Sequence, residues 1–340
     1  MNYIEFFKKT VNLYADKTAL IDLDGSRSIT YSQLDLLSSY VAGKLQKSGI
    51  NKGSFVLINI GRKMEYIASY LGILKAGCVV VPVVPEYPQE RINYIYDNCN
   101  AKFIITEDFF DGIENFSPAE VETNDGDFAL LVYTSGSTGT PKGILYTAKD
   151  LVNAAVRQKV ILDGIDCINH ASGTLFTFAI HIFEYLSILL LGGTIHILTE
   201  EVRHSSELIA KYYEDNGITT GVITPQLLRL FKTDSKTLLR VVTGSERVSN
   251  IYSADYDILS IYGMSETAII AGFHIDKPYN NTPLGTAFDG VKVIVCDEDG
   301  NELKDGDEGE IYICGDFDVT YFKNEELTEA TMEKMPDGTT

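Results

Sequence analysis

Short β-branched segments that alternate with helical patterns limit this chain to a narrow set of folds. Residues 55–60 read Phe-Val-Leu-Ile-Asn-Ile, and a second apolar segment covers residues 78–84. Between them, residues 65–75 place apolar side chains at helical spacing and are followed by Gly77. Strand–helix–strand order with short connections is typical of parallel sheets covered by helices. The sequence therefore predicts an α/β fold.

The pattern continues along the chain and changes character near residue 276. An acidic, polar segment at residues 107–127 is predicted to be a surface loop or a segment boundary. Further strands are predicted at residues 103–105, 194–198, 220–223, 240–243, 291–296 and 310–314. The last two are separated by acidic links that contain glycine, which is typical of hairpins.

The length of 340 residues exceeds what one compact core usually needs. We therefore predict two or three packed subdomains, with two packed, mostly parallel sheets and their helices in residues 1–275. For residues 276–340 we predict a small antiparallel, β-barrel-like subdomain.

Composition and charge exclude several classes of protein. Hydrophobic residues make up 45% of the chain and charged residues 22%, which is ordinary for a soluble globular protein. The formal net charge of −20 argues against binding to nucleic acid or to a membrane surface, because both carry negative charge. The most apolar stretch, residues 180–191, is too short to span a bilayer, and the N-terminus does not resemble a secretory signal.

The five cysteines are odd in number and none lies in a C-x-x-C pair. This usage predicts reduced thiols in a cytoplasmic protein and gives no support to a zinc site.

The most specific segment is residues 131–144, Leu-Val-Tyr-Thr-Ser-Gly-Ser-Thr-Gly-Thr-Pro-Lys-Gly-Ile. An apolar strand enters a loop of glycine and hydroxyl residues, and a lysine follows. Free backbone N–H groups, hydroxyl donors and one cation can together hold a polyphosphate. A flexible surface loop is the alternative, but the ordered string after an apolar strand favours a phosphate site. The residues predicted to bind nucleotide are Thr134, Ser135, Gly136, Ser137, Thr138 and Gly139, with Lys142 as the cation.

Residues 134–143 resemble the signature loop of the adenylate-forming superfamily. This superfamily includes acyl-CoA synthetases, peptide-synthetase adenylation domains and luciferase-like enzymes. Four shorter segments resemble further motifs in the family's order: Ile29–Leu34 ("LTYxEL"), Leu74–Pro82 ("LKAGxxxVP"), Tyr262–Thr267 ("YGxTE") and Gly309–Gly315 ("GELxIxG"). The chain is identified as the large N-terminal part of such an enzyme.

The resemblance implies adenylation of a carboxylic acid by ATP, with Mg²⁺ as cofactor. Glu266 would hold the metal, and Lys142 would offset charge on the pyrophosphate. Ser265 stands where the family usually has threonine and would donate to the α-phosphate. Tyr262, beside Gly263, would stack on adenine, and Gly244, Ser245 and Glu246 resemble the "GGE" segment of the adenine pocket.

Each role has a structural alternative. Glu266 could be an acid at a helix start, Ser265 an N-cap and Tyr262 a core aromatic. His170 falls near a histidine of many acyl-activating relatives, and a purely structural histidine is an equal interpretation.

Residues 178–184 resemble the peptide-synthetase pattern "FDxSVxE", but Ala179 stands where the family has its aspartate. That aspartate pairs with the α-ammonium of an amino acid. A buried ammonium without a partner costs roughly 3–5 kcal/mol, which is at least a hundredfold in affinity. We therefore expect an acid without an α-amino group: aryl, short acyl, hydroxy or α-keto. The other predicted pocket residues are Ile180, Phe183, Val241, Thr243, Ile261, Ile269 and Ile270. A shifted register, with this segment as a core helix, is the alternative.

In relatives, a ribose-binding aspartate and a C-terminal lid with a second catalytic lysine follow the position where this sequence ends. The resemblance therefore implies an absent lid and weak turnover by residues 1–340 alone. The acceptor of the acyl group would be coenzyme A or a carrier-protein phosphopantetheine. Two other functions stay open: an α-amino acid-activating domain, and a nucleotide-binding module with a decayed site.

Overall fold

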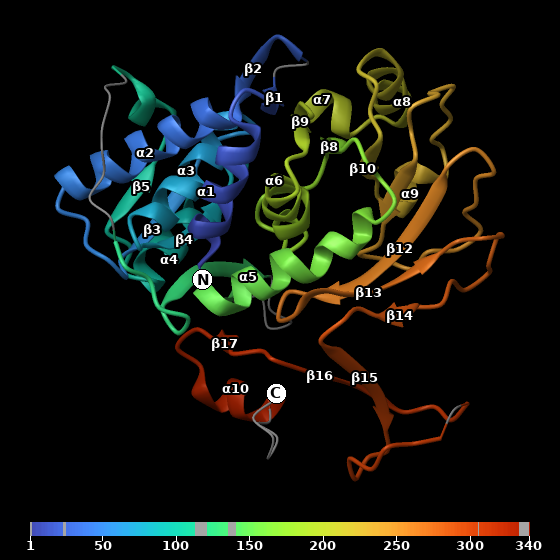
Figure 1. Cartoon of the computed structure of the whole chain (residues 1–340). Coiled ribbons are helices and arrows are strands. Elements are labelled where there is room, and N and C mark those ends of the chain that lie inside the picture. The colour runs from blue at the N-terminus through green and yellow to red at the C-terminus, as the bar shows by residue number, and fades with distance from the viewer. Residues whose placement is uncertain (1, 23–24, 113–120, 135–140, 305, 333–339) are drawn as a thin grey trace.

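The computed structural model describes residues 2–22, 25–112, 121–134, 141–304, 306–332 and 340. Among these residues, the strands form two large sheets and one two-stranded ribbon. Figure 1 shows the two sheets side by side, with the ribbon extending away from both. Most neighbouring strands of the large sheets are parallel, which confirms the predicted α/β class.

The first large sheet has nine strands and contains both early and late parts of the chain. Its order is β14 (Thr286–Ala287), β13 (Ala268–His274), β12 (Asp257–Met264), β11 (Arg240–Thr243), β10 (Thr220–Val222), β8 (Asn169–Ser172), β9 (Thr194–Ile197), β1 (Thr18–Asp22) and β2 (Arg27–Thr30). β1 is parallel to β9, so the first strand of the chain joins a sheet built mostly from residues 169–287.

The second large sheet has six strands, of which the inner ones match the predicted strand–helix–strand segment. Its order is β17 (Thr320–Tyr321), β7 (Lys142–Thr147), β6 (Phe128–Thr134), β4 (Val79–Val83), β3 (Phe55–Asn59) and β5 (Phe103–Ile105). β3, β4, β5 and β6 are parallel, whereas β7 and β17 are antiparallel to their neighbours.

Helices cover the sheets on both faces. They are α1 (Tyr3–Tyr14), α2 (Tyr31–Lys47), α3 (Met64–Lys75), α4 (Gln89–Asn98), η2 (Glu107–Phe110), α5 (Ala148–Arg157), η3 (Gln158–Leu162), η4 (Ile182–Ser187), α6 (Ile188–Leu190), α7 (Glu200–Arg203), α8 (Ser206–Asp215), α9 (Pro225–Leu228) and α10 (Glu325–Thr331). The sequence sets several of their ends. α2 begins with a capping box between Thr30 and Gln33, and α3 is followed by Gly77 at φ 67°, a left-handed conformation that favours glycine.

Strand residues alternate between two cores, as the period of a strand requires. In β3, Val56 and Ile58 face the central core between the sheets, which also contains the apolar faces of α2 and α3. Leu57 faces the opposite side, where α4 contributes Ile92 and Ile95. Both faces of the six-stranded sheet are therefore buried, which explains the continuous apolar segments in the sequence.

The segment at residues 107–127 is only partly the surface loop that the sequence predicts. Phe109 in η2 is buried, and its carbonyl oxygen accepts hydrogen bonds from Tyr40 and Lys44 of α2. Residues 113–120 lie outside the described part of the chain.

The C-terminal residues form a ribbon rather than a closed barrel in the part that the structure describes. β15 (Val291–Cys296) and β16 (Glu310–Gly315) pair with each other as the predicted antiparallel hairpin. β14 and β17, in contrast, belong to the two large sheets. All five cysteines are unbridged. Within the described residues, no helix is both long enough and apolar enough to cross a membrane.

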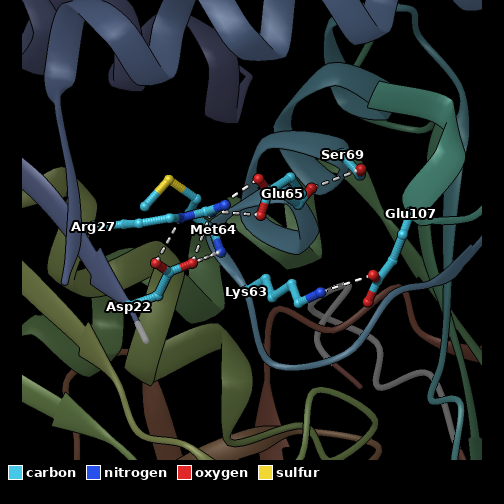
Figure 2. Close-up of polar contacts among 7 residues, drawn as sticks. All are labelled: Asp22, Arg27, Lys63, Met64, Glu65, Ser69 and Glu107. Carbon is cyan, nitrogen blue, oxygen red and sulfur yellow. Dashed lines mark hydrogen bonds and ion pairs between the residues drawn. The ribbon is translucent and has the colours of Figure 1, made fainter. Parts of the chain in front are cut away.

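A buried carboxylate connects the nine-stranded sheet to a helix of the six-stranded sheet (Figure 2). Asp22, at the end of β1, is fully buried and accepts two hydrogen bonds of 3.0 Å from Arg27. It also accepts a 2.9 Å hydrogen bond from the backbone N–H of Met64, at the start of α3. Arg27 extends to Glu65 of the same helix at 2.8 Å. This network ties the edge of the nine-stranded sheet to a helix that packs on the six-stranded sheet.

Substitution of Asp22 by alanine is expected to lower the free energy of unfolding by about 2 kcal/mol. The change leaves Arg27 and the Met64 N–H without their buried acceptor, and partial exposure of Arg27 reduces the loss. Chemical denaturation measures it. Lys63→Ala is the matched control, because it breaks an exposed ion pair with Glu107 and should cost less than about 1 kcal/mol. Equal losses in the two variants would contradict this account.

Candidate active site

The two ends of the predicted phosphate loop lie side by side. β6 ends at Thr134 and β7 begins at Lys142, and these two residues are paired across the antiparallel hairpin. The predicted loop residues Ser135, Gly136, Ser137, Thr138 and Gly139 lie outside the described residues. The hairpin therefore fixes where the loop starts and where it ends.

Lys142 is half-buried at the start of β7. In the described part of the chain, its ammonium group has no hydrogen-bond or ion-pair partner. The next residue, Gly143, is closely packed: an added Cβ atom would lie 3.0 Å from Leu131 and 3.1 Å from Phe322. The backbone beside Lys142 is thus held in place, whereas the positive charge of the Lys142 ammonium group is not neutralised by the described residues.

The Tyr262–Thr267 motif forms a β-hairpin that connects β12 to β13. Ser265, Glu266 and Thr267 are its turn, which we call the signature turn, and Ala268 begins β13 with φ 57°. The alternative interpretation of Glu266 as a helix-start acid and Ser265 as an N-cap is therefore wrong, because a strand and not a helix follows the turn.

Three side chains hold the signature turn, and all come from β7, α5 or β17. The Tyr146 hydroxyl donates to the carbonyl oxygen of Ser265 at 2.5 Å. Arg157 donates to the carbonyl oxygen of Thr267 at 2.7 Å. The Tyr321 hydroxyl donates to Oε1 of Glu266 at 2.7 Å. The signature turn is therefore fixed against the strand that begins at Lys142.

Burial and the hydrogen bond to Glu266 raise the pKa of Tyr321 to about 12. The hydroxyl therefore stays protonated, and stays a donor, at neutral pH. No local sequence pattern marks Tyr146, Arg157 or Tyr321. They contact the turn from 119, 110 and 55 residues away in the chain.

In the predicted adenine pocket, two glycines lie so close to a neighbouring backbone carbonyl oxygen that a side chain would not fit. An added Cβ atom on Gly263 would lie 2.2 Å from the carbonyl oxygen of Ala268, and one on Gly244 would lie 2.7 Å from that of Ile261. Ser245 has φ 70°, the left-handed region in which the family's motif has glycine. Glu246 is exposed and accepts a 3.2 Å hydrogen bond from Gln226.

Tyr262 is half-buried and packs in a small cluster with Ile270, Ala271 and Phe317. This contact fits the interpretation as a packing aromatic and leaves part of the ring accessible. Thr243, at the end of β11, is fully buried, and within the part of the chain that the structure describes its hydroxyl oxygen has no hydrogen-bond partner.

The residues predicted to line the acid pocket divide between three clusters. Phe183, Ile180, Ile261 and Ile269 share the central core. Val241 packs on the other side of the nine-stranded sheet, with α8 and α9. Ile270 packs with Phe317, away from the others.

The strand period explains this division, because Val242 of β11 faces the central core in place of Val241. Ala179 is 8% exposed. It lies in turns that precede η4, which is a π-helical stretch. Most of the segment at residues 178–184 is therefore buried, as the core-helix alternative requires, but Phe178 is 58% exposed and the segment is not a regular α-helix.

Glu184 anchors the segment that precedes Ala179. Its fully buried carboxylate accepts hydrogen bonds from the backbone N–H groups of Gly173 at 3.0 Å and Thr174 at 3.2 Å, and from the Thr174 hydroxyl. Oε1 also lies 3.7 Å from Nε2 of His170. The Glu184 carboxylate thus shapes the turn at residues 173–174.

Arg62, which follows β3 of the six-stranded sheet, holds the turn at residues 172–174 in place. It donates to the carbonyl oxygens of Ser172 and Leu198, both at 2.7 Å, and of Thr174. Tyr66 stacks on Phe176 with ring centroids 3.7 Å apart. Residues 172–176, which precede the predicted pocket residue Ala179, are therefore held in place by Arg62 and by helix α3 of the six-stranded sheet.

Two buried histidines lie near these contacts: His170 in β8 and His181, which precedes η4. His170 meets the edge of Phe183 with ring centroids 5.5 Å apart, and neither of its ring nitrogens has a hydrogen-bond partner among the described residues. His181 contacts the Phe178 carbonyl oxygen at 2.8 Å and the Tyr70 hydroxyl at 3.2 Å. Burial lowers the pKa of His181 to about 4, so its ring is neutral at physiological pH.

Comparison with curated proteins finds peptide synthases as relatives. Bacitracin synthase 1 of Bacillus licheniformis is 29% identical over 332 residues, which cover 92% of this chain and 6% of the synthase. Surfactin synthase subunit 1 of Bacillus subtilis (strain 168) is 28% identical and covers 99% of this chain and 10% of its own length. The chain thus spans a small fraction of these relatives.

Solved structures show the same fold. The Klebsiella oxytoca NpsA N-terminal subdomain superposes with a TM-score of 0.86 at 24% identity, over 98% of this chain and 92% of the subdomain. An artificially fused adenylation–PCP di-domain, NpsA-ThdA, gives a TM-score of 0.87 at 23% identity and covers 99% of this chain and 73% of its own.

The family described as "AMP-binding enzyme" matches residues 7–123 and 109–320, which together cover most of the chain. The matched region includes both strands of the β6–β7 hairpin and the signature turn. The chain belongs to the AMP-binding enzyme family.

Proposed function

We propose that this chain activates a carboxylic acid with ATP, giving an acyl-AMP and pyrophosphate. The observation that carries the proposal is the attachment of the signature turn to β7 and β17 by Tyr146 and Tyr321. This attachment keeps the carboxylate of Glu266 in a fixed relation to the hairpin from which Lys142 projects. A site that must hold a polyphosphate and a cation needs that fixed relation.

The donor set around Glu266 fits Mg²⁺ bound together with phosphates. Among the described residues, no group of three or more His, Cys, Asp or Glu side chains could form a metal cage. Mg²⁺ is usually held by one or two carboxylates plus substrate phosphates, and Glu266 would be that carboxylate. The metal, when bound, would offset negative charge on the phosphates.

The reaction needs positioning and charge compensation rather than a general base. An oxygen of the substrate carboxylate attacks the α-phosphorus of ATP, and the bond from that phosphorus to the pyrophosphate oxygen breaks. Pyrophosphate leaves with the electron pair. Lys142 would stabilise the charge on the leaving group, and Ser265 would donate to the α-phosphate. The backbone around Gly244 and Gly263 would receive the adenine, with Tyr262 against its face.

For the acid, we propose a substrate without an α-amino group. Ala179 offers no charge to an ammonium, and the buried carboxylate of Glu184 is already engaged by two backbone N–H groups and a hydroxyl. The Klebsiella oxytoca subdomain of the same fold was solved with 3-hydroxyanthranilyl-AMSN and with 3-hydroxybenzoyl-AMSN. An aryl acid is therefore our first choice within the aryl, acyl, hydroxy and α-keto classes.

An α-amino acid is the second candidate, because the curated relatives at 28–29% identity are synthases named for bacitracin and surfactin. For the acceptor we propose a carrier-protein thiol, with coenzyme A as the alternative. The NpsA-ThdA fusion, which joins an adenylation domain to a PCP, supports a carrier protein.

Calorimetric titration with two matched acyl-sulfamoyl adenosines tests the substrate class. One compound carries an α-amino group and the other lacks it. We expect the amino-free compound to bind at least a hundredfold more tightly, because a buried ammonium would have no partner. Tighter binding of the amino compound would establish the second candidate, and failure of both to bind would refute the proposed function.

Replacing Lys142 by alanine is expected to weaken the binding of a non-hydrolysable ATP analogue about 10- to 100-fold. A hydrogen bond to a charged group contributes about 1.5–3 kcal/mol, and AMP, which lacks the outer phosphates, should bind unchanged. Isothermal titration calorimetry measures both affinities. Lys232→Ala, an exposed lysine in the loop after α9, is the control. An equal loss of AMP and ATP-analogue affinity would contradict the role of Lys142 at the pyrophosphate.

A further inference from the structure

Tyr321 lies on the strand that pairs with the phosphate-loop hairpin. In β17, Tyr321 is opposite Ile144 of β7, two positions from Lys142. Its backbone N–H donates to the Thr328 hydroxyl at 3.0 Å, and the next N–H, of Phe322, donates to the Gly143 carbonyl oxygen at 2.8 Å. The backbone on either side of the Tyr321 side chain is therefore fixed.

The Tyr321 hydroxyl is directed to one oxygen of Glu266. It donates to Oε1 at 2.7 Å, and in the described part of the chain Oε2 accepts no hydrogen bond. A carboxylate held at one oxygen by a neutral donor cannot rotate freely, and its other oxygen keeps a constant direction. The contact also joins Glu266 to the same hairpin that positions Lys142.

We propose that Tyr321 is a positioning residue for the magnesium-binding carboxylate of Glu266. This inference rests on the proposed function, because it assumes that Glu266 holds Mg²⁺. The hydroxyl would orient Oε1 so that Oε2 faces the cation and the phosphates. Groups that orient a metal ligand through hydrogen bonds typically change metal affinity by 10- to 100-fold when they are removed.

The attachment of β17 to the sheet does not depend on this hydroxyl. Phe322 packs against Phe55 with ring centroids 5.3 Å apart, and the Lys323 ammonium donates to the Asn98 carbonyl oxygen at 2.5 Å. Tyr321→Phe therefore removes the hydroxyl while these anchors remain. A role in metal binding and a role in stability can thus be separated by experiment.

The experiment titrates MgCl₂ into the full chain with a fixed concentration of a non-hydrolysable ATP analogue, and measures AMP affinity and thermal unfolding in parallel. In Tyr321→Phe, we expect the Mg²⁺ concentration at half-saturation to rise about 10- to 100-fold, with AMP affinity unchanged. Glu266→Gln serves as the reference for loss of the metal ligand. Tyr312→Phe, at an exposed position of β16, is the matched control.

The outcomes separate failure of the role proposed for Tyr321 from failure of the proposed function. Wild-type Mg²⁺ dependence that persists unchanged in Tyr321→Phe would overturn the inference and leave the proposed function in place. A parallel loss of AMP affinity in that variant would also overturn it, because it would show a structural role alone. Failure of the wild-type chain to bind the ATP analogue would refute the proposed function, and this inference with it.

Discussion

Glu184→Ala is expected to lower the free energy of unfolding by about 4 kcal/mol. The substitution leaves the N–H groups of Gly173 and Thr174 and the Thr174 hydroxyl without their acceptor in a half-buried turn. Each unsatisfied buried group costs about 1–3 kcal/mol, and the half-buried positions of Gly173 and Thr174 place the sum below the maximum. Denaturation in urea, followed by circular dichroism, measures the change.

Two further variants make this prediction specific. Glu298→Ala removes an exposed carboxylate from the turn of the β15–β16 ribbon and should stay within about 0.5 kcal/mol of wild type. Glu184→Gln keeps one acceptor oxygen and should fall between the two. A loss below 1 kcal/mol in Glu184→Ala would show that the turn at residues 173–174 does not depend on this carboxylate.

Gly263→Ala is expected to destabilise the chain by about 3 kcal/mol and to weaken nucleotide binding more than tenfold. The new Cβ atom would lie 2.2 Å from the Ala268 carbonyl oxygen and 2.7 Å from the Ile269 Cα atom, and both belong to the backbone. Backbone cannot move aside as a flexible side chain can, so β12 and β13 must separate next to the signature turn. Thermal unfolding and calorimetric titration with AMP measure the two effects.

Gly126→Ala is the matched control for this substitution. No atom of the described residues lies within 4 Å of a Cβ atom at Gly126, so the change should be neutral or slightly stabilising. If Gly263→Ala bound AMP as tightly as Gly126→Ala, the close approach of β12 and β13 would be irrelevant to the nucleotide site.

Local patterns predicted the inner six-stranded sheet well. The apolar segment at residues 55–60 is β3, the helical spacing at residues 65–75 is α3, and Gly77 ends that helix. These features depend on neighbours in sequence, so the sequence alone carries them. The place of β1 in the nine-stranded sheet could not be predicted, since its partner β9 lies far along the chain.

In the candidate site, too, local motifs predict some residues, whereas contacts between distant parts of the chain were not predictable. The motifs identified Lys142, Ser265 and Glu266, but not the three side chains that hold the signature turn from other elements. Val241, which stays a predicted pocket residue, packs on the side of the nine-stranded sheet opposite to Val242. Neighbouring residues of a strand face opposite sides, and resemblance over short segments does not show which side lines a pocket.

The late pairing of the first strand has a consequence for biosynthesis. Thr18 of β1 accepts a hydrogen bond from Thr194 of β9, 176 residues later in the chain. At a synthesis rate of about 5–20 residues per second, the first strand waits roughly 10–35 s on the ribosome before its neighbour emerges. During that time the edge of β1 that later pairs with β9 is unpaired, and unpaired strand edges promote aggregation. The nine-stranded sheet can therefore be completed only after its later strands, up to β14, have been synthesised.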